Sequence, residues 1–394
     1  MVKVVDEVKK IEQDIISWQR DLHQIPELQL ELPKTSKYVM DRLNEMGIEY
    51  QTLVNGNAIV GLIRGNEEGK TLGIRADMDG LPIVEETGLP YASTNGNMHA
   101  CGHDGHIAML LGAAKILNEN KDKFKGNVKL LFQPGEEFPG GAKPMIDEGA
   151  LENPKVDAVI GLHAGGLSEE LPHGKIGIRY DTMMASMDRV LIKIKGKGCH
   201  GAYPHLGVDP IVTAAEVVTS LQTIVSREIA AVEPVILSIC RINGGFNQNI
   251  IPDEVELEGT IRTFNNETRK KIDRRIEETV KGITMAHGAD YEYLYEYKYP
   301  PLINNKEFTY EFLKSAKKIL KEEDIVELKE PLMGGEDMAF FLEKVPGTFF
   351  YLSNQKEIGG KVYGHHTSKF ALDENELWKG SALFIQLALD YLNK

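Results

Sequence analysis

The chain has 394 residues, of which 42% are hydrophobic and 26% charged, so it has the composition of a globular protein and the length of two domains. Its net charge of −14 argues against nucleic acid or an anionic membrane as the main partner, because both select basic surfaces. The chain has three widely spaced cysteines, which predicts no disulfide framework. It has no apolar run of roughly 18 residues and no signal-peptide core near the N-terminus, so we expect a cytoplasmic protein.

The first half of the chain alternates between helical and strand-like patterns. Helices are predicted within 8–22, from 35 to 47 and at 107–117, and strands at 58–63, 71–76, 127–132 and 156–162. Three of these strands end in side chains that bind metal or carry protons: Asp77 and Asp79, Glu136 and Glu137, and His163. Because the carboxyl ends of parallel strands share one sheet edge, the pattern predicts an α/β sheet with its active edge there.

The densest group of metal-binding side chains is His99-Ala100-Cys101-Gly102-His103-Asp104-Gly105-His106. Three imidazoles, a thiol and a carboxylate are the donors that a divalent ion such as zinc prefers. Gly102 and Gly105 allow a tight turn that brings Cys101 and His103 to one point, and Asp104 is the predicted cap of the following helix. The alternative is a turn with scattered histidines and a buried thiol, but this density of ligand types favours a metal site.

The adjacent carboxylates of Glu136 and Glu137 are expected to differ in role. Neighbouring residues of extended chain face opposite sides, so one carboxylate could bind metal while the other faces a bound water. A pair that only decorates the surface is the alternative. His365 and His366 follow a predicted strand at 348–352 and are the expected source of a last ligand.

The pattern changes after residue 183. Strands at 187–195, 235–242, 255–261 and 291–297 and helices at 210–225 and 268–285 follow one another in the order β-α-β-β-α-β. This order matches a ferredoxin-like module inserted in the sheet domain. We therefore expect a sheet domain of residues 1–183 and 299–394, which carries the predicted metal site, and an inserted domain of residues 184–298. Within the insert, the residues alone favour ordinary turns rich in Gly, Pro and Asn over functional segments at 198–205 and 244–252.

Several motifs occur in the order in which one known family carries them. They are Arg75-Ala76-Asp77-Met78-Asp79, Met98-His99-Ala100-Cys101-Gly102-His103-Asp104, Gln133-Pro134-Gly135-Glu136-Glu137, Gly161-Leu162-His163, Gly198-Cys199-His200-Gly201-Ala202-Tyr203-Pro204-His205, Asn249-Ile250-Ile251-Pro252-Asp253 and His366-Thr367-Ser368-Lys369-Phe370. The chain resembles the M20 metallopeptidases, in particular the amidohydrolase branch that includes hippurate hydrolase, indole-acetyl-amino-acid hydrolases and thermostable carboxypeptidase.

The resemblance implies a mixed-sheet, zinc-peptidase-like catalytic domain with an inserted ferredoxin-like dimerisation domain, and so a homodimer. It also implies two divalent metal ions per subunit, which would be zinc or, instead of zinc, manganese or cobalt. The implied metal ligands are Cys101, which the two ions share, with His103, Glu137, His163 and His366.

The same resemblance implies roles for five further residues. Glu136 would be the general base, and Asp79 would orient the site from behind the ligands. His200 would reach into the active site of the partner subunit. Asn249 and Arg262 fall where related enzymes bind the α-carboxylate of the substrate. A second carboxylate-binding arginine of some relatives is missing, and Tyr299 stands near its place.

The function expected from these features is hydrolysis of the amide bond of N-acyl amino acids, or of the C-terminal peptide bond of short peptides. Metal-activated water would attack, and Glu136 would take its proton. Two alternatives belong to other classes: a thiol hydrolase with Cys101 as nucleophile, and a non-catalytic metal-binding interaction protein. The second gives no reason for the pairing of Glu136 with Glu137.

Overall fold

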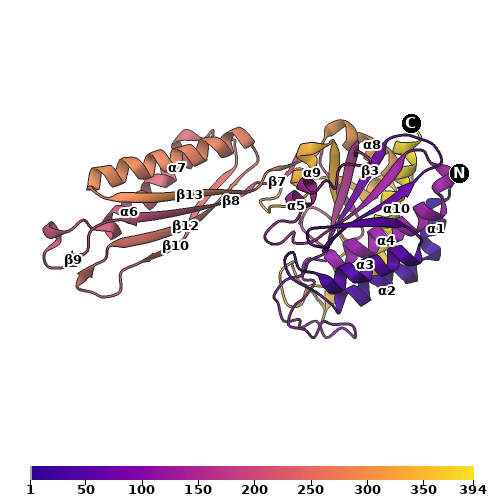
Figure 1. The fold of residues 1–394 in the computed structure, drawn as a ribbon, viewed down its shortest axis with the longest axis horizontal. Coiled ribbons are helices and arrows are strands. Elements are labelled where there is room, and N and C mark those ends of the chain that lie inside the picture. The colour runs from indigo at the N-terminus through magenta and orange to yellow at the C-terminus, as the bar shows by residue number, and fades with distance from the viewer. Residues whose placement is uncertain (1) are drawn as a thin grey trace. The chain divides into compact units, whose positions relative to one another are not determined.

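The computed structural model describes residues 2–394, and the chain forms two compact units (Figure 1). The first unit contains the chain up to residue 183 together with 303–331 and 337–394. The second contains residues 184–302 and takes in the short segment 332–336. No helix within residues 2–394 combines the length and apolarity needed to cross a membrane.

The first unit is built on a mixed sheet whose strands lie in the order β1-β2-β4-β3-β5-β16-β6-β15. Its centre is parallel, formed by β4 (Asn127–Gln133), β3 (Thr71–Asp77), β5 (Ala158–Ala164) and β16 (Gly347–Leu352). These strands are buried along almost their whole length, which explains their continuous apolar sequences. The flanking strands are β1 (Glu49–Leu53), β2 (Ala58–Arg64), β6 (Ile176–Ile178) and β15 (Ile325–Glu327).

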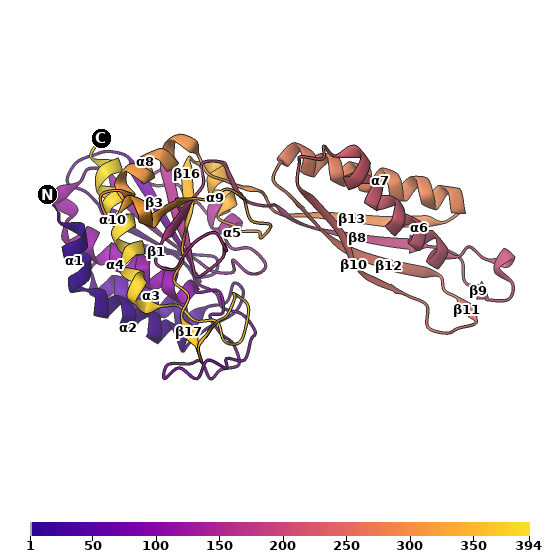
Figure 2. The same cartoon turned by 180° about the vertical axis from the view of Figure 1, so that it is seen from behind.

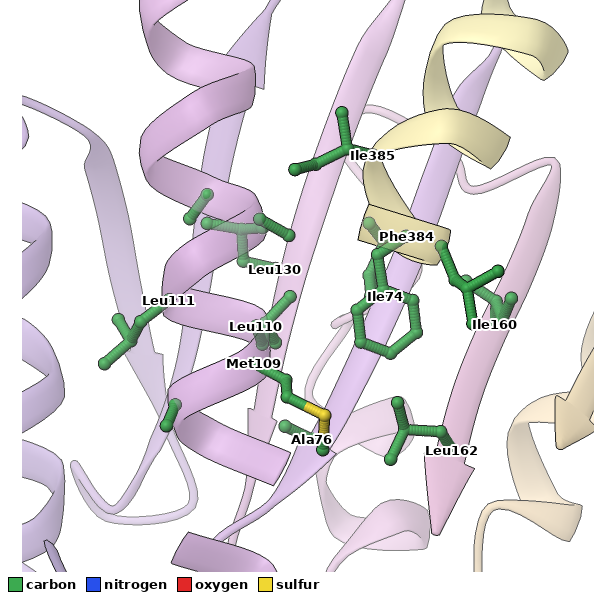
Figure 3. Close-up of a cluster of buried hydrophobic side chains, with 14 of the residues drawn as sticks. Ile74, Ala76, Met109, Leu110, Leu111, Leu130, Ile160, Leu162, Phe384 and Ile385 are labelled. Atoms are coloured by element: carbon green, nitrogen blue, oxygen red, sulfur yellow. The ribbon is translucent and has the colours of Figure 1, made fainter. Parts of the chain in front are cut away.

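Two buried helices cover the centre of this sheet. In Figure 3, Met109 and Leu110 of α4 (His103–Glu119) lie beside Ile74 and Ala76 of β3, and Phe384 of α10 (Leu377–Leu392) lies in the same cluster. Because α4 is enclosed on nearly every side, its sequence is apolar all round. The remaining helices of this unit are α1 (Val4–Lys10), α2 (Glu12–His23), α3 (Pro33–Glu45), α5 (Ala142–Asp147), α8 (Lys306–Ala316) and α9 (Ala339–Lys344).

The start of α4 differs from the prediction. The residue before the helix is Gly102, whose φ of +88° is a left-handed conformation that favours glycine, and no side chain caps the helix. The prediction that Asp104 is the N-cap is therefore wrong. The Asp104 carboxylate instead accepts hydrogen bonds from His23 and Gln19 of α2, so long-range partners replace the local cap.

The second unit has a four-stranded antiparallel sheet in the order β10-β12-β8-β13 (Figure 2). The strands are β8 (Met187–Lys195), β10 (Val235–Gly244), β12 (Glu254–Thr263) and β13 (Asp290–Tyr299). Helices α6 (Pro210–Thr223) and α7 (Asn266–His287) pack on one face, against alternate residues of β8 such as Val190 and Ile192. The predicted β-α-β-β-α-β module within a mixed α/β protein is confirmed. The remaining short strands of the chain are β7 (Thr182–Met184), β9 (Cys199–His200), β11 (Ile250–Ile251), β14 (Leu302–Ile303), β17 (Glu357–Ile358) and β18 (Lys361–Val362).

Candidate metal centre

The carboxyl ends of β3, β4 and β5 bring together the polar side chains that follow them. Asp77 ends β3, the Glu136–Glu137 pair follows β4, and His163 lies near the end of β5. Cys101 and His103, at the start of α4, meet these groups at the same edge. Residues from four separate parts of the first unit thus form one buried polar centre, at the edge where the sequence predicts it.

Cys101 belongs to two overlapping groups of candidate ligands. One group joins Cys101, His163 and His365, and the other joins Cys101, Glu137 and His366, with ligand atoms within 4.8 Å of one another in each. The Cys101 Sγ lies 3.3 Å from the His163 Nε2. The His163 Nδ1 donates to the Ala164 carbonyl at 2.8 Å, so in the neutral imidazole the Nε2 lone pair faces the sulfur.

His103 and Glu137 present buried polar atoms that lack hydrogen bonds. Neither ring nitrogen of His103 makes a well-aligned hydrogen bond, although the side chain is fully buried. Each nitrogen faces a carboxylate instead: Nδ1 lies 3.4 Å from the Asp79 Oδ1, and Nε2 lies 3.7 Å from the Asp77 Oδ2. The Oε1 atom of Glu137 lacks one as well, although the His366 Nε2 lies 3.0 Å from it. Since buried polar atoms are nearly always paired, these atoms fit a site for cations. The sulfur, nitrogen and oxygen donors of the centre are ligand types that bind divalent metal ions.

Asp79 holds the glutamate pair through the backbone. Its Oδ1 accepts from the Glu136 N–H at 2.9 Å, and its Oδ2 accepts from the Glu137 N–H at 3.0 Å. Residues 136–139 form a turn, so the expectation of extended chain with opposed side chains is wrong. Both carboxylates reach within 4.8 Å of a His103 ring nitrogen, but only Glu137 also joins the group of Cys101 and His366.

Two histidines that the sequence does not separate from the ligands have other bonds. The His106 Nδ1 donates to the Asp77 carboxylate, and its Nε2 accepts from the Ala164 N–H at 2.8 Å, so neither nitrogen is available for a metal ion. The His365 Nε2 donates to the Ala164 carbonyl at 3.0 Å. The sequence placed His106 in the predicted metal-binding cluster and offered His365 beside His366 as a source of the last ligand, and only these long-range bonds distinguish the two from the proposed ligands.

The electrostatics of the centre disfavour a nucleophilic cysteine. Burial, together with the charges of Glu137, Glu136 and Asp77, raises the pKa of the Cys101 thiol well above its usual value. A catalytic thiol needs a lowered pKa and an electropositive surrounding, because the thiolate is the nucleophile. The carboxylates around Cys101 therefore disfavour an unassisted thiolate nucleophile, whereas the same negative charges attract the cation that a thiolate ligand requires.

The model of Peptidase family M20/M25/M40 matches residues 73–390. The chain belongs to this family. It is 41% identical to thermostable carboxypeptidase 1 of Saccharolobus solfataricus over all of this chain and 99% of that protein. It is 46% identical to an N-acyl-L-amino acid amidohydrolase of Geobacillus stearothermophilus, over 77% of this chain and 81% of the relative. The resemblance seen in the motifs is confirmed, and the protein is an M20 hydrolase.

A solved structure supports the assignment of the fold. A Bacillus subtilis protein described as a dinuclear metal binding peptidase of the M20 family superposes with a TM-score of 0.83 at 35% identity. The match covers 98% of this chain and 99% of that one. The M20 hydrolase described here thus shares its whole fold with a protein that binds two metal ions.

The buried pair of His23 and Asp104 lies behind the start of α4 in this M20 hydrolase. The His23 Nδ1 donates to Asp104 at 2.8 Å, and its Nε2 lies 3.2 Å from Glu85. Burial alone would lower the pKa of His23, but the carboxylates of Asp104 and Glu85 outweigh burial and raise this pKa from 6.5 to about 10. Burial alone would raise the pKa of Asp104, but the charge and hydrogen bond of His23 outweigh burial and lower this pKa to about 2.

This pair predicts a pH window of stability. The raised pKa of His23 adds stability that is complete below pH 6.5 and is lost as the pH rises towards about 10. The change His23→Gln should cost about 3–5 kcal/mol at pH 6, because it leaves buried carboxylates unpaired, and should reduce the alkaline slope to the part that His103 contributes, whose pKa is also raised to about 10. Urea unfolding of the metal-free protein from pH 6 to 9 checks both, with the half-exposed His173→Gln as control. An unchanged slope in His23→Gln would refute the assignment.

The second unit holds the remaining candidate residues in two separate places. His200 on β9 pairs with Ile250 on β11, and the Gly201 N–H donates to the Asn249 carbonyl at 2.7 Å, so His200 and Asn249 are neighbours. The Gly198 N–H donates to Asp253 at 2.8 Å, so the His200 segment lies beside the start of β12. Arg262 lies eight residues along β12 from Glu254, which is roughly 26 Å at about 3.3 Å per residue. The structure therefore brings His200 and Asn249 together but keeps Arg262 apart from them.

Proposed function

We propose that this M20 hydrolase cleaves the amide bond of N-acyl amino acids, or the C-terminal peptide bond of short peptides, with two divalent metal ions. The observation that carries the proposal is the convergence of thiol, imidazole and carboxylate donors around buried atoms that lack hydrogen bonds. The relatives named as an N-acyl-L-amino acid amidohydrolase and a carboxypeptidase support the substrate class.

The proposed ligands are Cys101, His103, Glu137, His163 and His366. The membership of Cys101 in two ligand groups supports its role as the ligand that both ions share. When bound, divalent ions supply a water whose pKa is lowered to about 7, and they polarise the scissile carbonyl.

Glu136 acts as the general base in this proposal. Its carboxylate takes a proton from the attacking water and delivers it to the leaving nitrogen. Asp79 fixes the orientation of Glu136 and Glu137 by accepting their backbone N–H groups. The imidazole of His200 donates a hydrogen bond to the oxygen that becomes negative during the attack.

Asn249 and Arg262 bind the α-carboxylate of the substrate. The Nη1 atom of Arg262 lacks a hydrogen-bond partner although it is buried, which suits a guanidinium that receives an anionic group. A single small substrate cannot span the distance between Arg262 and the His200–Asn249 pair within one chain. If all three serve one site, two chains must contribute, and this supports a homodimer. We keep a reducing, cytoplasmic compartment as part of the proposal, since all three cysteines are free thiols.

Removal of metal tests the function directly. Dialysis against a chelator should abolish hydrolysis of N-acyl amino acids and dipeptides, because the ions supply the activated water. Addition of zinc, manganese or cobalt should restore hydrolysis, and the ion that restores most identifies the working metal. Rates are measured on a panel of both substrate types, with metal content followed by elemental analysis. Full activity in protein shown to be metal-free would exclude the mechanism.

A further inference from the structure

The loop that carries Glu136 and Glu137 closes on itself. Gly141 packs so tightly against the Pro134 carbonyl that a Cβ atom would lie 1.7 Å from its oxygen, which explains the glycine. The Gly140 N–H donates to the Gly135 carbonyl at 2.9 Å. Residues 134–141 therefore leave the end of β4 and return to the same point.

The carboxylate of Asp337 lies at that point and accepts from both ends of the loop. Its Oδ2 accepts from the Gly141 N–H at 2.9 Å and the Ala142 N–H at 3.0 Å. The Nε2 of Gln133, the last residue of β4, lies 2.8 Å from both Asp337 oxygens. Asp337 is completely buried and lies 204 residues from Gln133 in sequence.

Arg75 connects Asp337 to the other side of the metal centre. Its Nη2 donates to the Asp337 Oδ1 at 2.8 Å, and its Nη1 donates to the Asp77 Oδ2 at 2.7 Å. Asp77 in turn lies 3.7 Å from the His103 Nε2. A continuous buried network thus runs from the base of the glutamate loop to the carboxylate that faces His103.

We propose that Asp337 is a positioning residue that holds the loop of Glu136 and Glu137 in place for metal binding and proton transfer. This inference rests on the roles that the proposed function gives to the two glutamates. Asp79 fixes the middle of the loop, and Asp337 fixes both ends. A carboxylate accepts all of these donors, whereas an amide of the same shape would turn an N–H group towards some of them.

The test compares Asp337→Asn with Glu374→Gln in the full-length protein. Glu374 is a matched control because it is a buried carboxylate of the same unit, bonded to Arg20 and Lys356 and outside the metal centre. Loss of a group that supports metal ligands from behind typically costs about 10- to 100-fold in metal affinity or activity. Asp337→Asn should lose that much in zinc affinity, measured by competition with a chelating dye, and in kcat, with KM little changed. Glu374→Gln should lose thermal stability without either effect.

A milder variant keeps the proposal falsifiable if Asp337→Asn does not fold. Gln133→Leu removes the bonds of Gln133 to Asp337 and its bond from the Arg75 Nε but leaves the Gly141 and Ala142 bonds to Asp337 in place, and smaller losses of zinc affinity and kcat are expected. Wild-type zinc affinity and kcat in folded Asp337→Asn or Gln133→Leu would overturn the proposal, as would equal losses in Glu374→Gln. If the wild-type protein hydrolyses no N-acyl amino acid or peptide, the proposed function fails, but the zinc affinities still decide the role of Asp337.

Discussion

Replacement of Glu136 by glutamine is expected to lower kcat by about 10²–10⁴ while both metal ions stay bound. The amide has the same shape as the carboxylate but cannot take the proton of the attacking water. The backbone bond from Glu136 to Asp79 does not involve the side chain, so the loop should keep its position. Steady-state kinetics on an N-acyl amino acid, with elemental analysis of the same samples, checks both parts of the prediction.

Glu137→Gln is the matched control, because the two residues share one loop and one supporting carboxylate. The Glu137 carboxylate groups with Cys101 and His366, so its amide variant should lose metal as well as activity. If Glu136→Gln loses metal while Glu137→Gln retains it, the roles of the two residues are exchanged. If neither variant slows hydrolysis, the base lies elsewhere.

The edge of the sheet that carries the metal centre could be predicted because its signals are local. Each of β3, β4 and β5 is a short apolar run that ends beside an acidic residue or a histidine, and parallel strands deliver such ends to one edge. The order of the inserted module was predictable for the same reason, since its strands alternate and its helices carry apolar residues at helical spacing.

Asp104 shows where local reasoning fails. Its position beside the start of α4 suits a helix cap. The Asp104 carboxylate instead accepts from two buried donors of α2, His23 and Gln19, which precede it by 81 and 85 positions in the sequence. The periodicity of apolar residues does not predict such long-range polar contacts. His103 and His106 also look alike in sequence, and only the long-range bonds of His106 to Asp77 and Ala164 separate it from the candidate ligands.

The hydrogen-bond network around Asp337 could not be predicted from the sequence, because its contacts also join residues that are far apart in the chain. The bond between Arg75 and Asp337 joins residues 262 positions apart, and each residue alone has an ordinary local setting. The glutamate pair was recognisable, but not the turn that lets both carboxylates approach His103. Residues that lie in short motifs could therefore be predicted from the sequence. The residues that hold those motifs in place could be found only from the three-dimensional structure.

His200 is expected to act on the active site of the partner subunit. Its Nδ1 accepts from the Ala202 N–H at 3.0 Å, so in the neutral imidazole the Nε2 carries the proton and is free to donate. An imidazole donor aimed at the developing oxyanion lowers the barrier without binding metal, and loss of one such donor typically costs about 10²–10³ in kcat. The variant His200→Ala should therefore retain its metal and most of its substrate affinity but lose turnover.

Mixing two inactive variants decides whether His200 crosses between subunits. A His200→Ala chain and a Glu136→Gln chain should each be nearly inactive as homodimers. In their heterodimer, one of the two active sites combines the intact Glu136 of one chain with the intact His200 of the other. Heterodimers purified with two different affinity tags should recover up to half of the wild-type activity per dimer. If verified heterodimers recover nothing, His200 acts within its own subunit or not at all.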